Sequence, residues 1–123
     1  MRDVSNHFCI IPPELMTGYL TPDECRYMPH GAIDITCSRK IVIDQSLIED
    51  SDGRRWSISM SAASKDDCLR DKDGVRAYIG VFMTDGSIRI LGTRNFIPRM
   101  TVTPYAGAFA ISVSFEALKS ISL

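Results

Sequence analysis

Apolar and polar residues alternate along several short stretches of this chain, with a period of two that is typical of β-strands with one buried face. The clearest stretch is residues 54–62, in which apolar side chains alternate with serines. This alternation puts Trp56, Ile58 and Met60 on one face and the serines on the other. We therefore expect a strand whose apolar face lies in a core.

An apolar run at residues 41–49 precedes this strand, and the turn sequence Asp-Ser-Asp-Gly at residues 50–53 joins the two. Whether the loop has two or four residues, Ile43 and Leu47 come to lie on the same face as Trp56. The sequence therefore predicts a β-hairpin with one apolar face.

A second hairpin is predicted around Asp85-Gly86, the dipeptide favoured in type I′ turns. Its strands are residues 78–84 and 87–91. With a two-residue loop, the opposing apolar pairs are Met83–Ile88 and Val81–Ile90. The other face carries Tyr78, Phe82 and Leu91. Because both faces are apolar, we expect this ribbon to be a central pair of strands, or to meet a partner with its second face.

A third hairpin is predicted from residues 100–102 to residues 109–115, through a turn at residues 104–107. Its expected pairs are Val102–Phe109 and Met100–Ile111. Shorter strand-like runs cover residues 4–11 and 33–37. The fold class that follows is all-β, a β-sandwich or barrel of roughly seven to eight antiparallel strands. We expect a single domain over residues 1–123. One shared core should contain Trp56, Ile58, Met60, Val81, Ile90, Ile111 and Val113.

Residues 12–31 break the strand pattern, because four prolines lie in this segment. The sequence Thr-Pro-Asp-Glu at residues 21–24 is typical of a helix N-terminus, so we expect one short helix near residues 22–28. The segment is also rich in apolar side chains, and we interpret it as a protein-interaction arm. Its candidate contact residues are Met16, Tyr19, Tyr27 and Met28. The alternative is that these side chains fold back over an open end of the barrel.

The composition is that of an ordinary globular domain, with 45% hydrophobic and 24% charged residues. The net charge of −1 gives no general attraction to nucleic acid, so we do not expect nucleic acid as a partner. The charges are uneven, with a balance of −5 over residues 1–53 and of +4 over residues 54–99. Folding can interleave these segments. If two faces of opposite sign result, they favour head-to-tail self-association.

Residues with catalytic or metal-binding potential are few and scattered. The four cysteines form no Cys-x-x-Cys motif, and we expect free, mostly buried thiols. His7 and His30 are the two imidazoles, and neither lies in a nucleophile motif. The carboxylate pairs Glu49-Asp50 and Asp66-Asp67 fall in polar turns, which favours solvated side chains over an acid pair. We therefore expect no catalytic residue, no metal and no cofactor, and a protein that is not an enzyme.

The N-terminus lacks a basic stretch followed by a long apolar core, and no apolar run approaches the ~20 residues of a membrane span. The sequence therefore predicts neither a signal peptide nor a membrane partner. We expect the chain to be cytoplasmic when it is synthesised.

The stretch from Gly80 to Thr93, followed by Pro98, together with the stretch from Gly107 to Phe115, resembles small virion or tail-associated proteins of phages and prophages of gut bacteria. Those proteins carry a β-hairpin, a Gly-Thr step after leucine or isoleucine, a proline and a closing strand that ends in phenylalanine. The resemblance implies an assembly role and incorporation in a virion, and it assigns no functional residue.

The leading interpretation is a non-enzymatic structural or assembly protein, a phage or prophage virion morphogenesis component. Its expected partners are further copies of the chain, in a homo-oligomer, or other virion subunits. The alternative is an intracellular β-barrel module that binds a ligand or nucleic acid.

Overall fold

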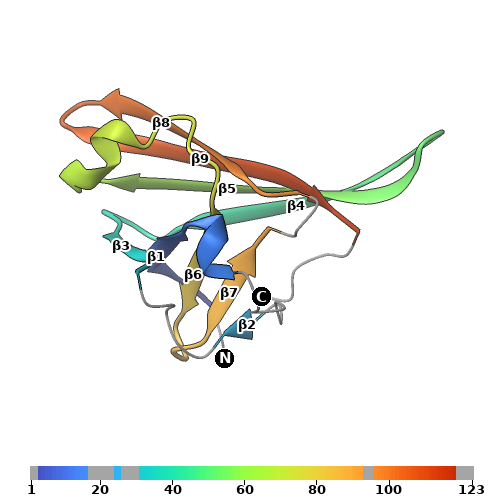
Figure 1. Cartoon of the computed structure of the whole chain (residues 1–123), viewed down its shortest axis with the longest axis horizontal. Helices are drawn as coiled ribbons and strands as arrows, with labels where there is room; N and C mark the ends of the chain where they lie inside the picture. Colours follow the sequence, from blue (N-terminus) through green and yellow to red (C-terminus); the bar gives the residue numbers. More distant parts are fainter. Residues whose placement is uncertain (1–2, 17–23, 26–30, 93–95, 119–123) are drawn as a thin grey trace.

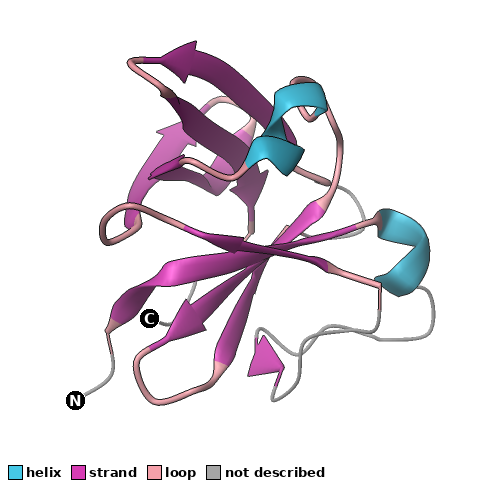
Figure 2. Cartoon of the chain, turned by 90° about the vertical axis from the view of Figure 1, so that its left-hand side faces the viewer, coloured by secondary structure: helices cyan, strands magenta, loops and turns pink. Residues whose placement is uncertain are grey.

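The chain folds into two antiparallel β-sheets that form a β-sandwich (Figure 1). A computed structural model describes residues 3–16, 24–25, 31–92 and 96–118, and for Met16, Glu24 and Cys25 it describes the backbone alone. The strands are β1 (Val4–Ile11), β2 (Glu24–Cys25), β3 (Ile33–Thr36), β4 (Val42–Asp50), β5 (Gly53–Ser64), β6 (Tyr78–Met83), β7 (Ile88–Leu91), β8 (Arg99–Tyr105) and β9 (Ala108–Ala117). Two short 3-10 helices, η1 (Pro13–Met16) and η2 (Asp67–Asp71), are the only helices of the described residues (Figure 2).

The predicted fold class is confirmed as a sandwich. Eight of the strands have four or more residues, and β2 adds a two-residue strand. One sheet has the order β2-β7-β6-β1-β3, and the other has the order β4-β5-β9-β8. No helix in the described part of the chain is long and apolar enough to cross a membrane.

The main core lies between the two sheets, where the alternating apolar faces of both meet. The five-stranded sheet contributes Phe8, Ile10 and Ile79, and the four-stranded sheet contributes Ile58 and Met60, all at most 2% exposed. Most of the predicted core is therefore confirmed. Ile58, Met60, Val81, Ile111 and Val113 are buried in this cluster, and Trp56 is partly buried against it.

The β4–β5 hairpin is confirmed with a two-residue loop, since Asp50 pairs with Gly53. Leu47 lies opposite Trp56, as the expected shared face requires. The hairpin is the longest of the fold, and its tip extends beyond the rest of the sandwich (Figure 1).

The β6–β7 hairpin forms where it was predicted, but its register differs by one residue. The N–H of Gly86 donates to the carbonyl of Met83, and the N–H of Met83 donates to the carbonyl of Ser87. Gly86 has a φ of 90°, so the loop has three residues and ends in a left-handed glycine instead of forming a two-residue turn. A one-residue slip exchanges the two faces of a strand.

This slip corrects the expected faces of β7. Leu91 lies in the main core and not on the face of Tyr78. Ile88 pairs with Phe82 and not with Met83. Val81 pairs with Arg89 instead of Ile90, so the Arg89 position lies on the face of the main core, and Arg89 is only 2% exposed. Ile90 belongs to a second cluster on the outer face of the five-stranded sheet, with Cys9, Ile11, Tyr78 and Ile88. As predicted, the β6–β7 ribbon is central in its sheet and apolar on both faces.

The β8–β9 hairpin differs from the prediction by two residues, which preserves its faces. Val102 pairs with Ile111 and Met100 with Val113, because the loop is the two-residue turn at Ala106 and Gly107. Both of these residues have positive φ values, of 51° and 79°, as a type I′ turn requires.

The helix predicted near residues 22–28 is wrong where the structure describes that segment. Glu24 and Cys25 form strand β2 and pair with Arg89 and Ile88 at the end of the five-stranded sheet. Backbone pairing to β7 therefore overrides the local helix-start sequence. Between β5 and β6, η2 forms a helical turn whose cap is Asp66, and the side chain of Asp66 accepts a hydrogen bond from the N–H of Cys68.

Candidate interaction site

The four residues predicted as protein contacts cannot be assembled into a site from the described structure. Met16 is the last residue of η1. Its side chain, and the whole of Tyr19, Tyr27 and Met28, lie outside the described residues. The candidate site must therefore be sought elsewhere on the fold, and the clearest feature is an outer strand of the four-stranded sheet.

Strand β4 forms one edge of that sheet. Its nine residues pair with β5 in an unbroken register from Val42 opposite Ser61 to Asp50 opposite Gly53. The strand contains no proline and no bulge, two of the features that commonly protect a sheet edge from further pairing. Within the described residues, no strand other than β5 pairs with it.

The backbone of β4 presents hydrogen-bonding groups to the outside. The N–H of Ile41, just before the strand, donates away from β5 to the carbonyl of Ser5 at 3.1 Å. Because backbone groups alternate in direction along a strand, the N–H groups of Ile43, Leu47 and Glu49 point to the same side. No described residue accepts a hydrogen bond from these three groups. We call them the β4 edge.

The side chains of β4 combine exposed apolar surface with negative charge. Val42 is 53% exposed and Leu47 is 38% exposed. The strand contains Asp44, Glu49 and Asp50 and no Lys or Arg. The two basic residues at positions 39 and 40 directly precede it, so the basic start and the acidic end of this segment carry opposite charges.

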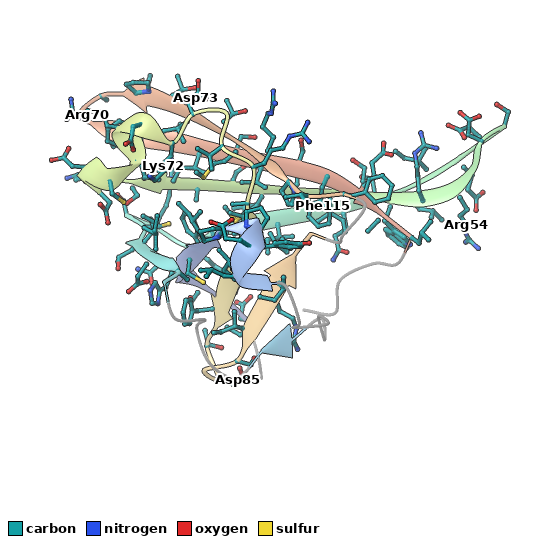
Figure 3. The ribbon with its side chains drawn as sticks, viewed as in Figure 1. Arg54, Arg70, Lys72, Asp73, Asp85 and Phe115 are labelled. Atoms are coloured by element: carbon teal, nitrogen blue, oxygen red, sulfur yellow. The ribbon has the colours of Figure 1, made fainter. Side chains whose placement is uncertain are left out.

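Ion pairs organise the tip of the β4–β5 hairpin. Arg55 donates to both carboxylate oxygens of Asp50 at 3.1 Å and to Glu116 of β9 at 3.1 Å. The pKa of Asp50 is lowered, first by the N–H of Asp52 and then by Arg55. Arg54 pairs with Glu49 at 3.0 Å, and Figure 3 shows Arg54 at the far end of the hairpin. Glu49 and Asp50 are thus solvent-exposed carboxylates paired with arginines, in agreement with the solvated side chains expected of a polar turn.

Strand β8, at the other edge of the same sheet, is closed. Its outward N–H groups belong to Met100 and Val102, which donate to the carbonyl of Val75 at 2.9 Å and to Asp73 Oδ1 at 3.0 Å. The next outward position is Pro104, which has no N–H. In the described structure, β4 is thus the long strand whose outer edge is left open.

A histidine–aspartate pair on the outer face of the five-stranded sheet was not predicted. His7 hydrogen-bonds to Asp34 through Nε2, and its ring stacks on Phe82 with 4.0 Å between centroids. A prediction that β1 pairs with β3 would have located this histidine–aspartate pair. In that register Asp34 lies opposite Cys9, so His7, two residues before Cys9, is its diagonal neighbour on the same face.

The described cysteines are free thiols, as predicted, at positions 9, 37 and 68. Burial raises the pKa of Cys37 to about 11, and burial is also the main cause that raises the pKa of Cys68 to about 11. Such thiols are protonated and poor nucleophiles at neutral pH. Among the described side chains, no group of three or more His, Cys, Asp and Glu residues could hold a metal ion.

A shallow hollow of about 470 Å³ lies on the outer face of the four-stranded sheet. Small hydroxyl side chains line it, namely Ser61, Ser112, Thr101 and Thr103, and Arg39 and Lys40 stand at its β4 side. Small side chains on a sheet face leave such a depression. The basic side chains of Arg39 and Lys40 at its margin would suit a polar or anionic group.

Comparisons with known proteins add no assignment to this description. The comparison with protein-family models found no match, and those with curated proteins and with solved structures found none either.

Proposed function

We propose that this chain is a non-enzymatic structural or assembly protein that docks on other subunits by adding a strand to β4. The observation that carries the proposal is the contrast between the two edges of one sheet. β8 is closed by hydrogen bonds and a proline, whereas no described residue accepts a hydrogen bond from the N–H groups of the β4 edge. A long regular edge strand is a template for pairing, and soluble proteins usually block it.

Strand addition would use the backbone of β4 for affinity and its side chains for selectivity. Each new backbone hydrogen bond contributes about 1 kcal/mol net, and the exposed Val42 and Leu47 add apolar surface for a partner strand to cover. The tip of the hairpin projects beyond the sandwich, so a partner strand can approach that end of β4 away from the other sheet (Figure 1).

The more specific part of the proposal is that the assembly is a phage or prophage virion. Its support is the resemblance of residues 80–93 and 107–115 to small virion or tail-associated proteins. Mass spectrometry of particles induced from cells that encode the chain should detect it in a fixed ratio to the other particle proteins. Its absence from such particles would contradict the virion assignment and leave the assembly role standing.

The assembly role itself is tested by the native size of the full chain in the cells that encode it. We expect wild type to migrate far above its 13.7 kDa monomer mass. Leu47→Pro removes one N–H of the β4 edge and should shift the chain toward the monomer. Leu47→Ala trims the same side chain but keeps the N–H, and should remain in the large complex. Wild type that migrates as a monomer in these cells contradicts the proposal.

A second candidate function, binding of an anionic ligand such as single-stranded nucleic acid, rests on the hollow beside Arg39 and Lys40. Fluorescence anisotropy with a labelled oligonucleotide tests it. If this function holds, binding should weaken with salt and should weaken further in Arg39→Gln, because Arg39 lines the hollow and makes no ion pair with a described residue. Binding that is equal in both proteins argues against the hollow as the site.

A further inference from the structure

We infer that the strand which adds to β4 is β4 of a second copy of this chain, paired antiparallel about a two-fold axis. The inference rests on the proposed function and names its partner. It depends on three observations, which are the open backbone, the order of charges along the segment, and the spacing of its apolar residues.

The order of charges favours an antiparallel pair of identical strands. Arg39 stands at the start of the segment and Asp52 at its end, and neither makes an ion pair with a described residue. Their neighbours are already paired, since Lys40 contacts Asp3 and the carboxylates of residues 49 and 50 contact Arg54 and Arg55. An antiparallel arrangement brings the acidic end of one copy to the basic start of the other, and the two-fold axis repeats this contact. A parallel arrangement would place acid beside acid and base beside base.

The spacing of the outward backbone groups selects a register. Full overlap of two copies of β4 places Ser46 on the two-fold axis, with Ile43 opposite the partner's Glu49. The three N–H groups of the β4 edge then each face an outward carbonyl of the partner. The N–H of Ile41, which already donates to Ser5, falls outside the paired stretch.

The same register matches the side chains. Leu47 becomes a diagonal neighbour of the partner's Leu47 and of the partner's Ile43, and Val42 of the partner's Ile48. No acidic residue lies directly opposite another acid. The two four-stranded sheets join into one continuous sheet, and the exposed surface of Val42 and Leu47 is covered.

The experiment is a charge exchange between two variants of the full chain, followed by sedimentation equilibrium. Arg39→Glu and Asp52→Lys each change a side chain that makes no ion pair with a described residue. Each variant alone brings like charges together at both ends of its own dimer. Mixed together, they restore an opposite-charge pair at both ends. We expect each variant to dimerise about tenfold more weakly than wild type, and the mixture to recover most of this loss.

Each result has a defined meaning. Wild type should reach twice its 13.7 kDa mass at micromolar concentration, and Leu47→Pro should not, with circular dichroism showing that the variant is folded. Failure of the mixture to recover contradicts the antiparallel two-fold arrangement. Wild type that stays monomeric when pure contradicts self-pairing, and in that case a large native size in cells, lost in Leu47→Pro, still supports assembly with a different subunit.

Discussion

The two outer strands of the four-stranded sheet, β4 and β8, have similar lengths but differ in the hydrogen-bond partners of their outward N–H groups. The outward N–H groups of β8 reach acceptors in residues 73–75, and Pro104 removes the next donor. At β4, Ile41 has such a partner just before the strand, whereas no described residue accepts a hydrogen bond from the N–H groups of Ile43, Leu47 and Glu49. Residues from η2 onward therefore close one edge, whereas the chain that precedes β4 closes only the start of the other.

The comparison shows that edge protection comes from tertiary contacts as much as from the strand's own residues. β8 has only one protective residue in its sequence, and its other donors are satisfied by residues about 25 to 30 positions away. Figure 3 shows Asp73 beside β8, at the end of the sheet opposite Arg54 and the open hairpin. If the contrast is functional, changes at β8 should affect stability and changes at β4 should affect association.

The strongest test places proline at an outward position of each edge. Met100→Pro removes the donor to Val75 and a side chain that is only 1% exposed, so we expect a loss of about 3 kcal/mol or more. Leu47→Pro removes an N–H that has no described acceptor, and should cost about 1 kcal/mol or less. Denaturant unfolding measures both, and equal losses would show that the two edges do not differ as described.

A smaller loss is expected when the closure of β8 is removed without touching the strand. Asp73→Ala deprives the partly buried N–H of Val102 of its acceptor, which should cost about 1–2 kcal/mol. Asp71→Ala is the matched control, because Asp71 is exposed and pairs only with Lys72 among the described residues. Faster hydrogen exchange of the Val102 amide should accompany the loss, and an unchanged rate would show that Asp73 does not close this edge.

Much of this fold, but not the contrast between its edges, could be predicted from sequence. Alternation and turn residues located all three hairpins, because both signals are local. The faces of β8 and β9 survived a two-residue register error, whereas a one-residue error at Gly86 moved Ile90 out of the main core. The open β4 edge depends on the pairing of β5 with β9, about 50 residues apart, and no local pattern reports this.

The turn of the β8–β9 hairpin offers a prediction of a substitution that stabilises the protein. Ala106 has a φ of 51° and is the only non-glycine residue with positive φ in the described part of the chain. Ala106→Gly should relieve this strain and stabilise the protein by about 0.5–1 kcal/mol. Ala108→Gly, in the adjacent strand, should destabilise it by a similar amount. Thermal unfolding of both variants measures the difference, and destabilisation by Ala106→Gly would contradict the strained turn.

The smallest effect on stability is expected at the tip of the β4–β5 hairpin, which is held by ion pairs, whereas the edge of β8 is held by hydrogen bonds of its backbone. Arg55→Gln breaks the links to Asp50 and Glu116, and should lower the melting temperature by about 1–2 °C. Arg54→Gln is the control, because its single pair with Glu49 is more exposed, and it should change almost nothing.

The pH dependence sharpens this last prediction. Folding lowers the pKa of Asp50 below 3.8, so its contribution to stability is present above that pH and is lost as the pH falls through the folded value. Arg55 is one of the two main causes of the lowered pKa, so Arg55→Gln should reduce the loss of stability in acid, while the N–H of Asp52 maintains the rest. If the acid dependence of Arg55→Gln equals that of wild type, the N–H of Asp52 alone lowers the pKa of Asp50, and the ion pair with Arg55 contributes nothing measurable to stability.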